Sequence, residues 1–332
     1  MKIIKRLLYF MYYLKKLDVA LFKKFVVHTK KTYNIGRLNQ YFLVFYNALK
    51  YNISILEFYQ FGFANKTAEE KKKWMGTGSM YELQKKDNPI EKRTILDDKR
   101  LFYQHYKEFF VHNVYKLEDF ENDKTRIQKV LLENEKIVFK ESDGKCGAGV
   151  LVKETKDFSN ENMIKFMKNN HYDMVETFIN QHSDIQSLSP SAVNTVRIFT
   201  RINSNGAYNV LGCRMRISVN STVDNLAAGN LAAPIGLKTG KIAGPAVYSD
   251  ITKPAETVHP ITGKTIVGFQ VPYWDEILEM VKKAHLSHPQ NRSIGWDVVV
   301  TENGPGLIEG NHDWCKLVWQ LPVNQGLKHL IN

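Results

Sequence analysis

The chain has 332 residues, of which 43% are hydrophobic and 24% are charged, and its formal net charge at pH 7 is +12. This composition excludes a disordered chain and allows a globular protein of two or three lobes. The odd number of cysteines (Cys146, Cys213 and Cys315), their wide spacing and the lack of a signal peptide favour a reduced, cytoplasmic setting. No uncharged apolar run reaches the roughly 20 residues that a membrane-spanning helix requires.

The positive charge is concentrated at the N-terminus. Residues 1–50 contain 11 Lys and Arg residues and one acidic residue, Asp18, so this segment carries about +10 of the net charge. The remainder of the chain is nearly neutral, which argues against a basic nucleic-acid groove across it. We therefore expect no nucleic-acid partner.

The first 30 residues are predicted to form one amphipathic helix. Its apolar positions recur at helical spacing and Asp18 alone interrupts them; they are Leu7, Met11, Leu14, Leu21 and Phe25. Two interpretations remain open. Either this helix binds an anionic membrane surface and holds the protein peripherally on the inner membrane face, or it packs on the body of the protein and builds the acceptor site.

Further helices and strands follow in chain order. Residues 38–63 are predicted to form one or two packed helices, and a capping box at Thr67 and Glu70 begins another. The segments 76–79 and 87–89 are expected to be loops. From about residue 95, predicted helices (119–135, 159–169 and 273–288) alternate with predicted strands (137–140, 172–179 and several within 193–220), and a Gly- and Ala-rich loop is expected at 226–236.

A predicted strand followed by a glycine-rich loop occupies residues 136–150, KIVFKESDGKCGAGV. Lys140 ends the strand, and the loop carries Gly144, Gly147 and Gly149. Glycine allows the backbone to approach a phosphate closely, and successive N–H groups can bind an anion. The segment matches neither the Walker pattern nor GxGxxG, so by itself it indicates either a phosphate-binding flap or an ordinary glycine-rich hairpin.

Three oxygen-bearing side chains converge in residues 295–311, GWDVVVTENGPGLIEGN. Asp297 begins an apolar strand, a turn follows, and the return strand carries Glu309 and Asn311. Because side chains two residues apart on a strand share a face, Glu309 and Asn311 project together, and the hairpin brings Asp297 towards them. Two carboxylates and an amide oxygen are hard ligands of the kind that Mg²⁺ takes. The segment predicts a magnesium site, against the alternative of a hairpin with polar ends.

Together these motifs resemble the ATP-grasp superfamily over roughly residues 95–320. The segments NTVRIFT (194–200), GWD (295–297) and IEGN (308–311) are most similar to the sugar-transfer-associated ATP-grasp proteins of bacterial polysaccharide loci. NTVRIFT and GCRMR (212–216) are also similar to glutamate-ligase-type members.

The resemblance implies an α+β ATP-grasp fold, in which two lobes hold ATP between them, with an N-terminal helical extension. The implied domains are a basic helical region at 1–92, a nucleotide lobe with a glycine-rich flap at 93–180, and a catalytic lobe with the magnesium ligands at 181–332.

The same resemblance implies a nucleotide site. Lys99, after Asp98, is similar to the first nucleotide lysine of the superfamily. Lys140 is similar to the second, which lies over the α- and β-phosphates, with residues 144–149 as the flap. In VETFINQHSDI (175–185), Glu176 and the backbone of Phe178 and Ile179 would contact adenine, and Asp184 would contact the ribose.

The resemblance also implies catalytic residues. Arg197, together with Arg214 or Arg216, would hold the γ-phosphate and an acyl-phosphate, and the triad of Asp297, Glu309 and Asn311 would hold one or two Mg²⁺ ions.

The activity that this resemblance implies is an ATP-dependent carboxylate–amine ligase that forms an amide through an acyl-phosphate. The polysaccharide-associated members imply a small-molecule or nucleotide-sugar acceptor with a uronic acid, and an amino acid or small amine as the donor. Two other interpretations stay open: a kinase that uses the same nucleotide site, and a nucleotide-binding scaffold that recruits glycan enzymes to the membrane.

Overall fold

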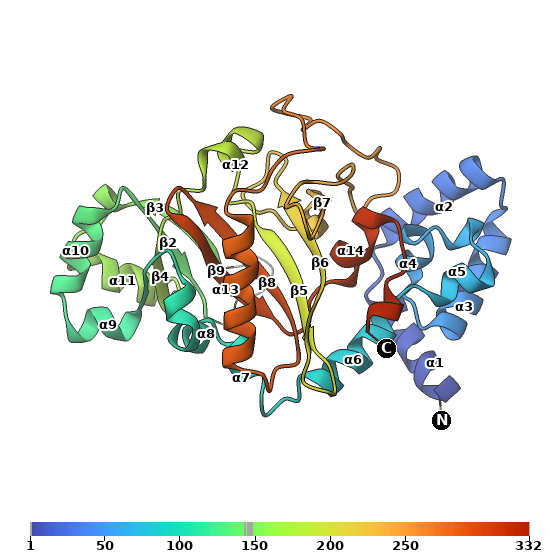
Figure 1. The fold of residues 1–332 in the computed structure, drawn as a ribbon, viewed down its shortest axis with the longest axis horizontal. Helices are drawn as coiled ribbons and strands as arrows, with labels where there is room; N and C mark the ends of the chain where they lie inside the picture. The colour runs from blue at the N-terminus through green and yellow to red at the C-terminus, as the bar shows by residue number, and fades with distance from the viewer. Residues whose placement is uncertain (1, 143, 145–148, 332) are drawn as a thin grey trace.

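The computed structural model describes residues 2–142, 144 and 149–331. Along the long axis of the molecule, a small lobe of helices and strands lies at one end, a five-stranded sheet lies in the middle, and a helical N-terminal region lies at the other end (Figure 1). Within the described part of the chain, no helix is both long and apolar enough to span a membrane.

The N-terminal region is built from short helices: α1 (Lys2–Lys15), α2 (Val19–Tyr33), α3 (Arg37–Tyr51), α4 (Ile55–Gln60), α5 (Ala68–Lys72) and α6 (Thr77–Asp87). The prediction of one helix over the first 30 residues is wrong. Asp18 is the N-cap of α2, and its carboxylate accepts a hydrogen bond from the Leu21 N–H at 2.9 Å. An aspartate that interrupts an apolar stripe therefore marks a helix start here.

The small lobe contains a four-stranded antiparallel sheet in the order β1-β4-β2-β3. The elements are β1 (Val114–Lys116), α9 (Leu117–Asn122), α10 (Thr125–Glu133), β2 (Lys136–Lys140), β3 (Val150–Glu154), α11 (Asn162–Asn169) and β4 (Met174–Thr177). Apolar side chains of the three helices pack on Phe139 and Val175, on one face of the sheet. Because strand side chains alternate, Lys140 and Glu176 lie on the opposite face.

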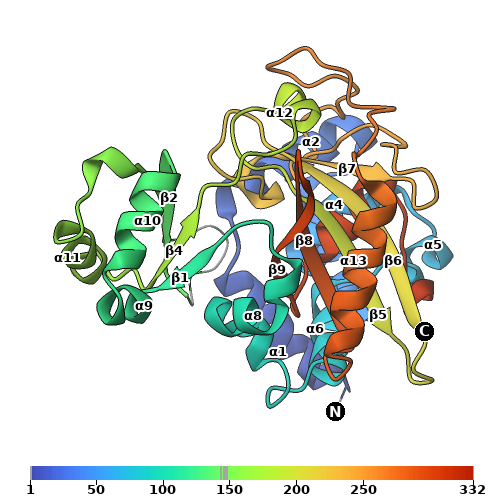
Figure 2. The ribbon, with the colours of Figure 1, turned by 60° about the vertical axis from the view of Figure 1, so that its left-hand side comes forward.

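The large sheet is antiparallel, in the order β7-β6-β5-β8-β9. Its strands are β5 (Val196–Ile202), β6 (Tyr208–Ile217), β7 (Leu231–Ile235), β8 (Ser293–Thr301) and β9 (Gly304–Asn311). On one face, Ile198, Met215 and Trp296 form a core with α8 (Lys99–Tyr106) and with α13 (Trp274–Ser287), which lies along the sheet (Figure 2). The residues between them in sequence project from the other face.

Several boundaries differ from the predictions because capping groups end or begin helices. The segment 119–135 forms two helices rather than one, since the Asp123 carboxylate accepts from the Thr125 N–H at 3.1 Å at the start of α10. The segment 76–79 is not a loop: α6 begins at Thr77, whose N–H donates to Glu57 at 3.0 Å. The last part of the expected loop at 226–236 is strand β7. The predicted capping box at Thr67 and Glu70 is confirmed at α5.

The N-terminal region packs firmly on the large lobe. The buried Glu57 carboxylate accepts from Thr77 and pairs with Lys316 Nζ at 3.1 Å, at the start of α14 (Lys316–Gln320). The buried Gln320 side chain bonds both the N–H and the carbonyl of Met75, at 2.9 and 3.0 Å. The remaining α-helices are α7 (Thr94–Asp97) and α12 (Ser183–Leu188).

Candidate active site

Asp297 is the centre of a buried charge cluster on the large sheet. It lies on β8 opposite Arg197 of β5, on the face that is turned away from α13. Arg197 donates to the two carboxylate oxygens from Nε and Nη2, at 2.5 and 2.7 Å, and Arg216 Nη1 lies 2.9 Å from both. Burial alone would raise the pKa of the Asp297 carboxyl, but the two guanidinium groups outweigh it and hold that pKa well below its usual range.

Glu309 and Asn311 join Asp297 through the β8–β9 register. Asp297 is paired with Glu309, and Gly295 with Asn311. The Asn311 amide donates to Glu309 Oε1 at 3.1 Å and to Asp297 Oδ2 at 3.5 Å. Burial and the neighbouring charge of Asp297 raise the pKa of Glu309. The structure thus brings the three predicted ligands together as a crowded pair of carboxylates and an amide.

The chemistry of this donor set fits Mg²⁺. A divalent cation relieves the repulsion between two carboxylates, and the Asn311 amide presents its oxygen to the same place by exchanging its O and N atoms. In the described part of the chain, no group of three or more His, Cys, Asp or Glu side chains could hold a metal ion. The candidate donor set is the pair of carboxylates of Asp297 and Glu309 with the amide oxygen of Asn311.

The sequence did not indicate which groups hold Arg216. Its Nη2 donates to Asp224 Oδ1 at 2.5 Å and also to Asn225. Asp224 accepts in turn from the Thr195 N–H at 2.9 Å. Although burial disfavours the charge of Arg216, Asp224 and Asp297 raise its pKa. Asp224 and Asn225 lie in the segment VDNLAAGN, which shows no periodicity that would mark them as arginine partners.

Arg214 is held differently from the other two arginines. Its guanidinium is buried, and it donates to the Trp319 carbonyl of α14, with Nε at 3.1 Å, and to the Cys213 carbonyl at 2.7 Å. Burial lowers its pKa to about 10. These contacts join β6 to α14, so that of the two predicted alternatives Arg216 is the one beside Asp297.

The face of the small sheet that is turned away from its helices carries Lys140 and Glu176. Lys140 Nζ lies 2.5 Å from Glu176 Oε2, and His112 Nε2 lies 3.4 Å from the same oxygen. Burial alone would raise the pKa of Glu176, but Lys140 and His112 outweigh it and lower that pKa to about 2. Both predicted residues are therefore on one face, and His112 is a partner that sequence analysis missed.

Lys99 forms hydrogen bonds with the backbone at the start of the glycine-rich loop. It is the first residue of α8, and its Nζ donates to the carbonyls of Glu141 at 3.2 Å, of Ser142 at 3.3 Å and of Gly144. The Asp173 carboxylate receives the Ser142 N–H at 2.7 Å. The loop base is thus tied to both Lys99 and the residue that precedes β4.

The remaining predicted nucleotide contacts are spread over the loop and the connection between the lobes. Gly149 has a φ of +71°, and a Cβ there would lie 2.9 Å from the Glu141 carboxyl carbon, so glycine is required. Gly147 lies outside the described residues. Phe178 and Ile179 are half-buried and follow β4, and Asp184 is exposed in the first turn of α12.

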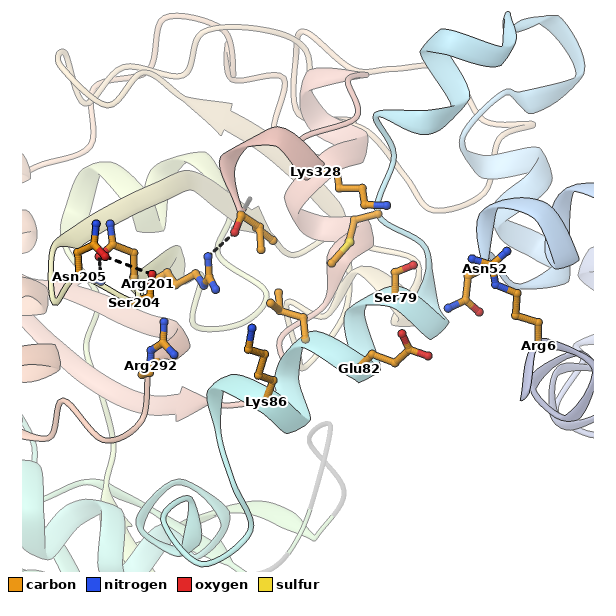
Figure 3. A pocket seen from close by; sticks show the side chains of 14 residues that line it. Arg6, Asn52, Ser79, Glu82, Lys86, Arg201, Ser204, Asn205, Arg292 and Lys328 are labelled. Atoms are coloured by element: carbon orange, nitrogen blue, oxygen red, sulfur yellow. Dashed lines mark hydrogen bonds between the residues drawn. The ribbon is translucent and has the colours of Figure 1, made fainter. Parts of the chain in front are cut away.

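One cavity lies away from these residues. It has a volume of about 730 Å³ and is lined by α6, by Arg6 of α1 and by the β5–β6 turn (Figure 3). Its guanidinium groups already have protein partners: Arg6 donates to the Leu49 carbonyl at 2.7 Å, and Arg201 Nε donates to Asp87 at 2.7 Å. None of the predicted nucleotide contacts lines this cavity, so it is separate from the predicted nucleotide site.

The small sheet and the large sheet are both antiparallel. Lysines lie on or beside the small sheet, and the arginines and the acidic triad lie on the large one, and together these features define the class of the protein. The fold is the ATP-grasp fold, with an N-terminal helical extension, and the chain is an enzyme of the ATP-grasp class. Residues 79–332 match the family described as sugar-transfer associated ATP-grasp, and the chain belongs to that family. No match exists among curated proteins.

Solved structures of ATP-grasp enzymes are similar to this chain at low identity. The ATP-grasp ligase PsnB, complexed with its minimal precursor, is 12% identical with a TM-score of 0.43, over 74% of this chain and 60% of that chain. D-alanyl-alanine synthetase A from Vibrio cholerae is 12% identical with a TM-score of 0.39, over 71% and 66%. Biotin carboxylase from Campylobacter jejuni is 13% identical with a TM-score of 0.43, over 71% and 47%.

Proposed function

We propose that this chain is an ATP-dependent carboxylate–amine ligase that joins an amino acid or small amine to a uronic acid of a surface-polysaccharide precursor. The observation that carries the proposal is the convergence of Asp297, Glu309 and Asn311 beside Arg197 and Arg216. The sugar-transfer description of the family supports the choice of a sugar acceptor.

In this proposal the small sheet binds the nucleotide. Lys99 and Lys140 meet the phosphates of ATP as point charges, and the backbone of Phe178 and Ile179 meets the adenine. Lys140 Nζ already lies 2.5 Å from the Glu176 carboxylate, whose pKa is lowered to about 2, and this contact fixes the position of the lysine. Bound Mg²⁺ would be held by the triad and would supply neutralisation of the charge on the phosphates.

The proposed reaction has two steps. A carboxylate oxygen of the acceptor attacks the γ-phosphorus of ATP, the bond to the bridging oxygen breaks, and ADP leaves. The amine nitrogen then attacks the acyl carbon, the bond between that carbon and the phosphate oxygen breaks, and inorganic phosphate leaves while the amine loses a proton. Arg197 and Arg216 stabilise the negative charge on the transferring group by donating to its oxygens.

The test is substrate-dependent release of ADP from the purified chain with ATP, Mg²⁺, nucleotide-linked uronic acids and a panel of amino acids, followed by the mass of the product. An amide formed with loss of water supports the ligase. A product that gains a phosphoryl group instead supports the kinase, and ATP binding without turnover across the panel supports the scaffold.

A matched pair of variants tests the site. Glu309→Ala should abolish ADP release, whereas Glu279→Ala, on the exposed surface of α13, should leave it unchanged. Turnover of Glu309→Ala at the wild-type rate with saturating Mg²⁺ would contradict the assignment of the triad.

A further inference from the structure

Helix α1 is apolar on its outward side as well as on its inward side. Its aromatic residues Tyr9, Phe10 and Tyr13 face the core of the N-terminal region. The opposite side faces outward and is apolar: Ile4 is 64% exposed, Leu8 65% and Met11 63%. A surface helix normally turns its apolar stripe inward and its charges outward.

Helix α3 also carries apolar side chains on its outward side. Its buried residues include two polar amides, and Gln40 donates to the carbonyls of Val26 at 3.1 Å and Ile35 at 2.8 Å. Its outward side holds large apolar side chains, with Leu38 82% exposed and Phe42 66% exposed. The helix therefore buries two amides beside Val44 and Ala48, and exposes several large hydrophobic side chains.

Helices α1 and α3 lie side by side. Phe10 of α1 and Phe45 of α3 meet edge to face with ring centroids 5.1 Å apart, and Arg6 of α1 donates to the Leu49 carbonyl at the end of α3. Of the 27 exposed large hydrophobic residues in the described chain, 15 lie within residues 3–46. We call the outward side of these two helices the apolar face; its residues are Ile3, Ile4, Leu7, Leu8, Met11, Leu14, Leu38, Phe42 and Phe45.

Basic residues accompany the apolar face, and one of them, Lys5 of α1, pairs with Glu82 of α6 at 2.9 Å. Lys15 and Lys16 follow at the end of α1, and Arg37 begins α3; all three are exposed. Asp18 caps α2, and the next acidic residue, Glu57, is buried. A second copy of this chain would bring like charges together around two apolar faces, which opposes a dimer at this surface.

We propose that the apolar face docks on a bilayer that contains anionic lipids, with α1 and α3 lying in the plane of the interface. Apolar side chains enter the boundary between headgroups and acyl chains, and the lysines meet the negative surface. This surface lies at the end of the long axis opposite the small lobe, so docking leaves the nucleotide lobe free (Figure 1).

A deletion of residues 1–30 does not test this proposal. Tyr13, Phe25 and Val26 are buried in a core that also includes Phe58 and Trp74, so the deletion opens that core. Substitutions on the outward side leave these contacts in place and are the appropriate probe.

The experiment measures co-sedimentation of the full chain with vesicles of phosphatidylcholine alone, or mixed equally with phosphatidylglycerol. We expect binding to the mixed vesicles at low salt and loss of binding in 1 M salt, where the Debye length is about 3 Å. Leu8→Glu with Phe42→Glu should weaken binding at least about tenfold. The matched control, Leu132→Glu with Leu286→Glu, changes exposed apolar residues elsewhere and should bind as the wild type does.

Lys15→Glu with Lys16→Glu should also weaken binding to the mixed vesicles. Circular dichroism must show that each variant is folded. Failure of the folded wild type to bind mixed vesicles at low salt would overturn the proposal, as would equal binding to both kinds of vesicle. If the protein self-associates without vesicles and Leu8→Glu with Phe42→Glu abolishes this, the partner of the apolar face is a second copy of the chain and the bilayer proposal is wrong. None of these outcomes depends on ligase activity.

Discussion

Glu309 is a proposed metal ligand whose charged form lowers the free energy of unfolding when no metal is bound. Its pKa is raised in the folded state, so folding is favoured while it is protonated, and this contribution is lost as the pH rises through the folded pKa. At neutral pH its charge therefore opposes folding.

We predict that Glu309→Gln has a higher melting temperature than the wild type at neutral pH in the presence of a chelator. Addition of Mg²⁺ should stabilise the wild type and have little effect on the variant. Thermal unfolding with and without Mg²⁺ checks both outcomes. Equal stabilisation of the two proteins by Mg²⁺ would show that Glu309 is not a ligand.

His285 is held neutral by the direction of its hydrogen bonds. Trp296 Nε1 donates to the Thr200 hydroxyl at 2.8 Å, the hydroxyl can then donate to His285 Nδ1 at 2.7 Å, and Nε2 faces the Asn291 carbonyl at 2.8 Å. A proton on Nδ1 would force the hydroxyl to turn to the Ile294 carbonyl, 3.4 Å away. Burial lowers the pKa of His285 to about 4.

Because this folded pKa lies below the ordinary value of 6.5, the contribution of His285 to stability is complete above pH 6.5 and is lost as the pH falls towards 4. The free energy of unfolding should fall over this range by up to roughly 3 kcal/mol from this residue. His285→Gln should flatten that part of the profile in urea unfolding, whereas the exposed control His329→Gln should not. An unchanged profile in His285→Gln would contradict this origin.

At the scale of elements, Asp18 decides that residues 2–33 form two helices. Asp18→Ala removes the acceptor for the Leu21 N–H and should lower the free energy of unfolding by about 1 kcal/mol. Asp18→Ser keeps an N-cap and should recover most of the loss. Urea unfolding of the three proteins measures this, and equal stability of the alanine variant would mean that the cap is replaced by solvent.

Local periodicity predicted elements well where one apolar stripe continues without interruption. The helix expected at 273–288 is α13, and the strand expected at 137–140 is β2. Breaks at Asp18 and Asp123 were missed, because a capping carboxylate and a solvated one look the same in a sequence. The apolar stripe of the first helix was also visible, but periodicity does not tell whether a stripe faces the core or the outside.

In the candidate site, too, the sequence predicted the local contacts and missed the long-range ones. Asp297, Glu309 and Asn311 follow from the alternation of side chains in one hairpin, and the structure brings them together. The partners of the arginines come from distant segments, such as Asp224 and the Trp319 carbonyl, and only the folded chain shows them.

At the scale of the whole molecule, Glu57 links the N-terminal region to α14, beside the large sheet. Glu57→Ala leaves the half-buried Lys316 ammonium without its partner and should destabilise the protein by roughly 3 kcal/mol. Adding Lys316→Met should recover part of that loss, because no unpaired charge then remains. A double-mutant cycle in urea unfolding measures the coupling, and additive losses would show that the pair contributes none.

The contact between Glu57 and Lys316 also has a mechanical consequence. The Glu57 carboxylate accepts hydrogen bonds from backbone N–H groups at the starts of α4 and α6, and it pairs with Lys316, the first residue of α14. In the same helix, the Trp319 carbonyl accepts a hydrogen bond from Arg214 of β6. A force applied to the N-terminal helices would therefore be transmitted through the Glu57–Lys316 pair and the Trp319–Arg214 hydrogen bond to β6, the strand that also carries Arg216. If the protein is attached through this end, these contacts would hold the large sheet at a fixed position relative to the attachment point.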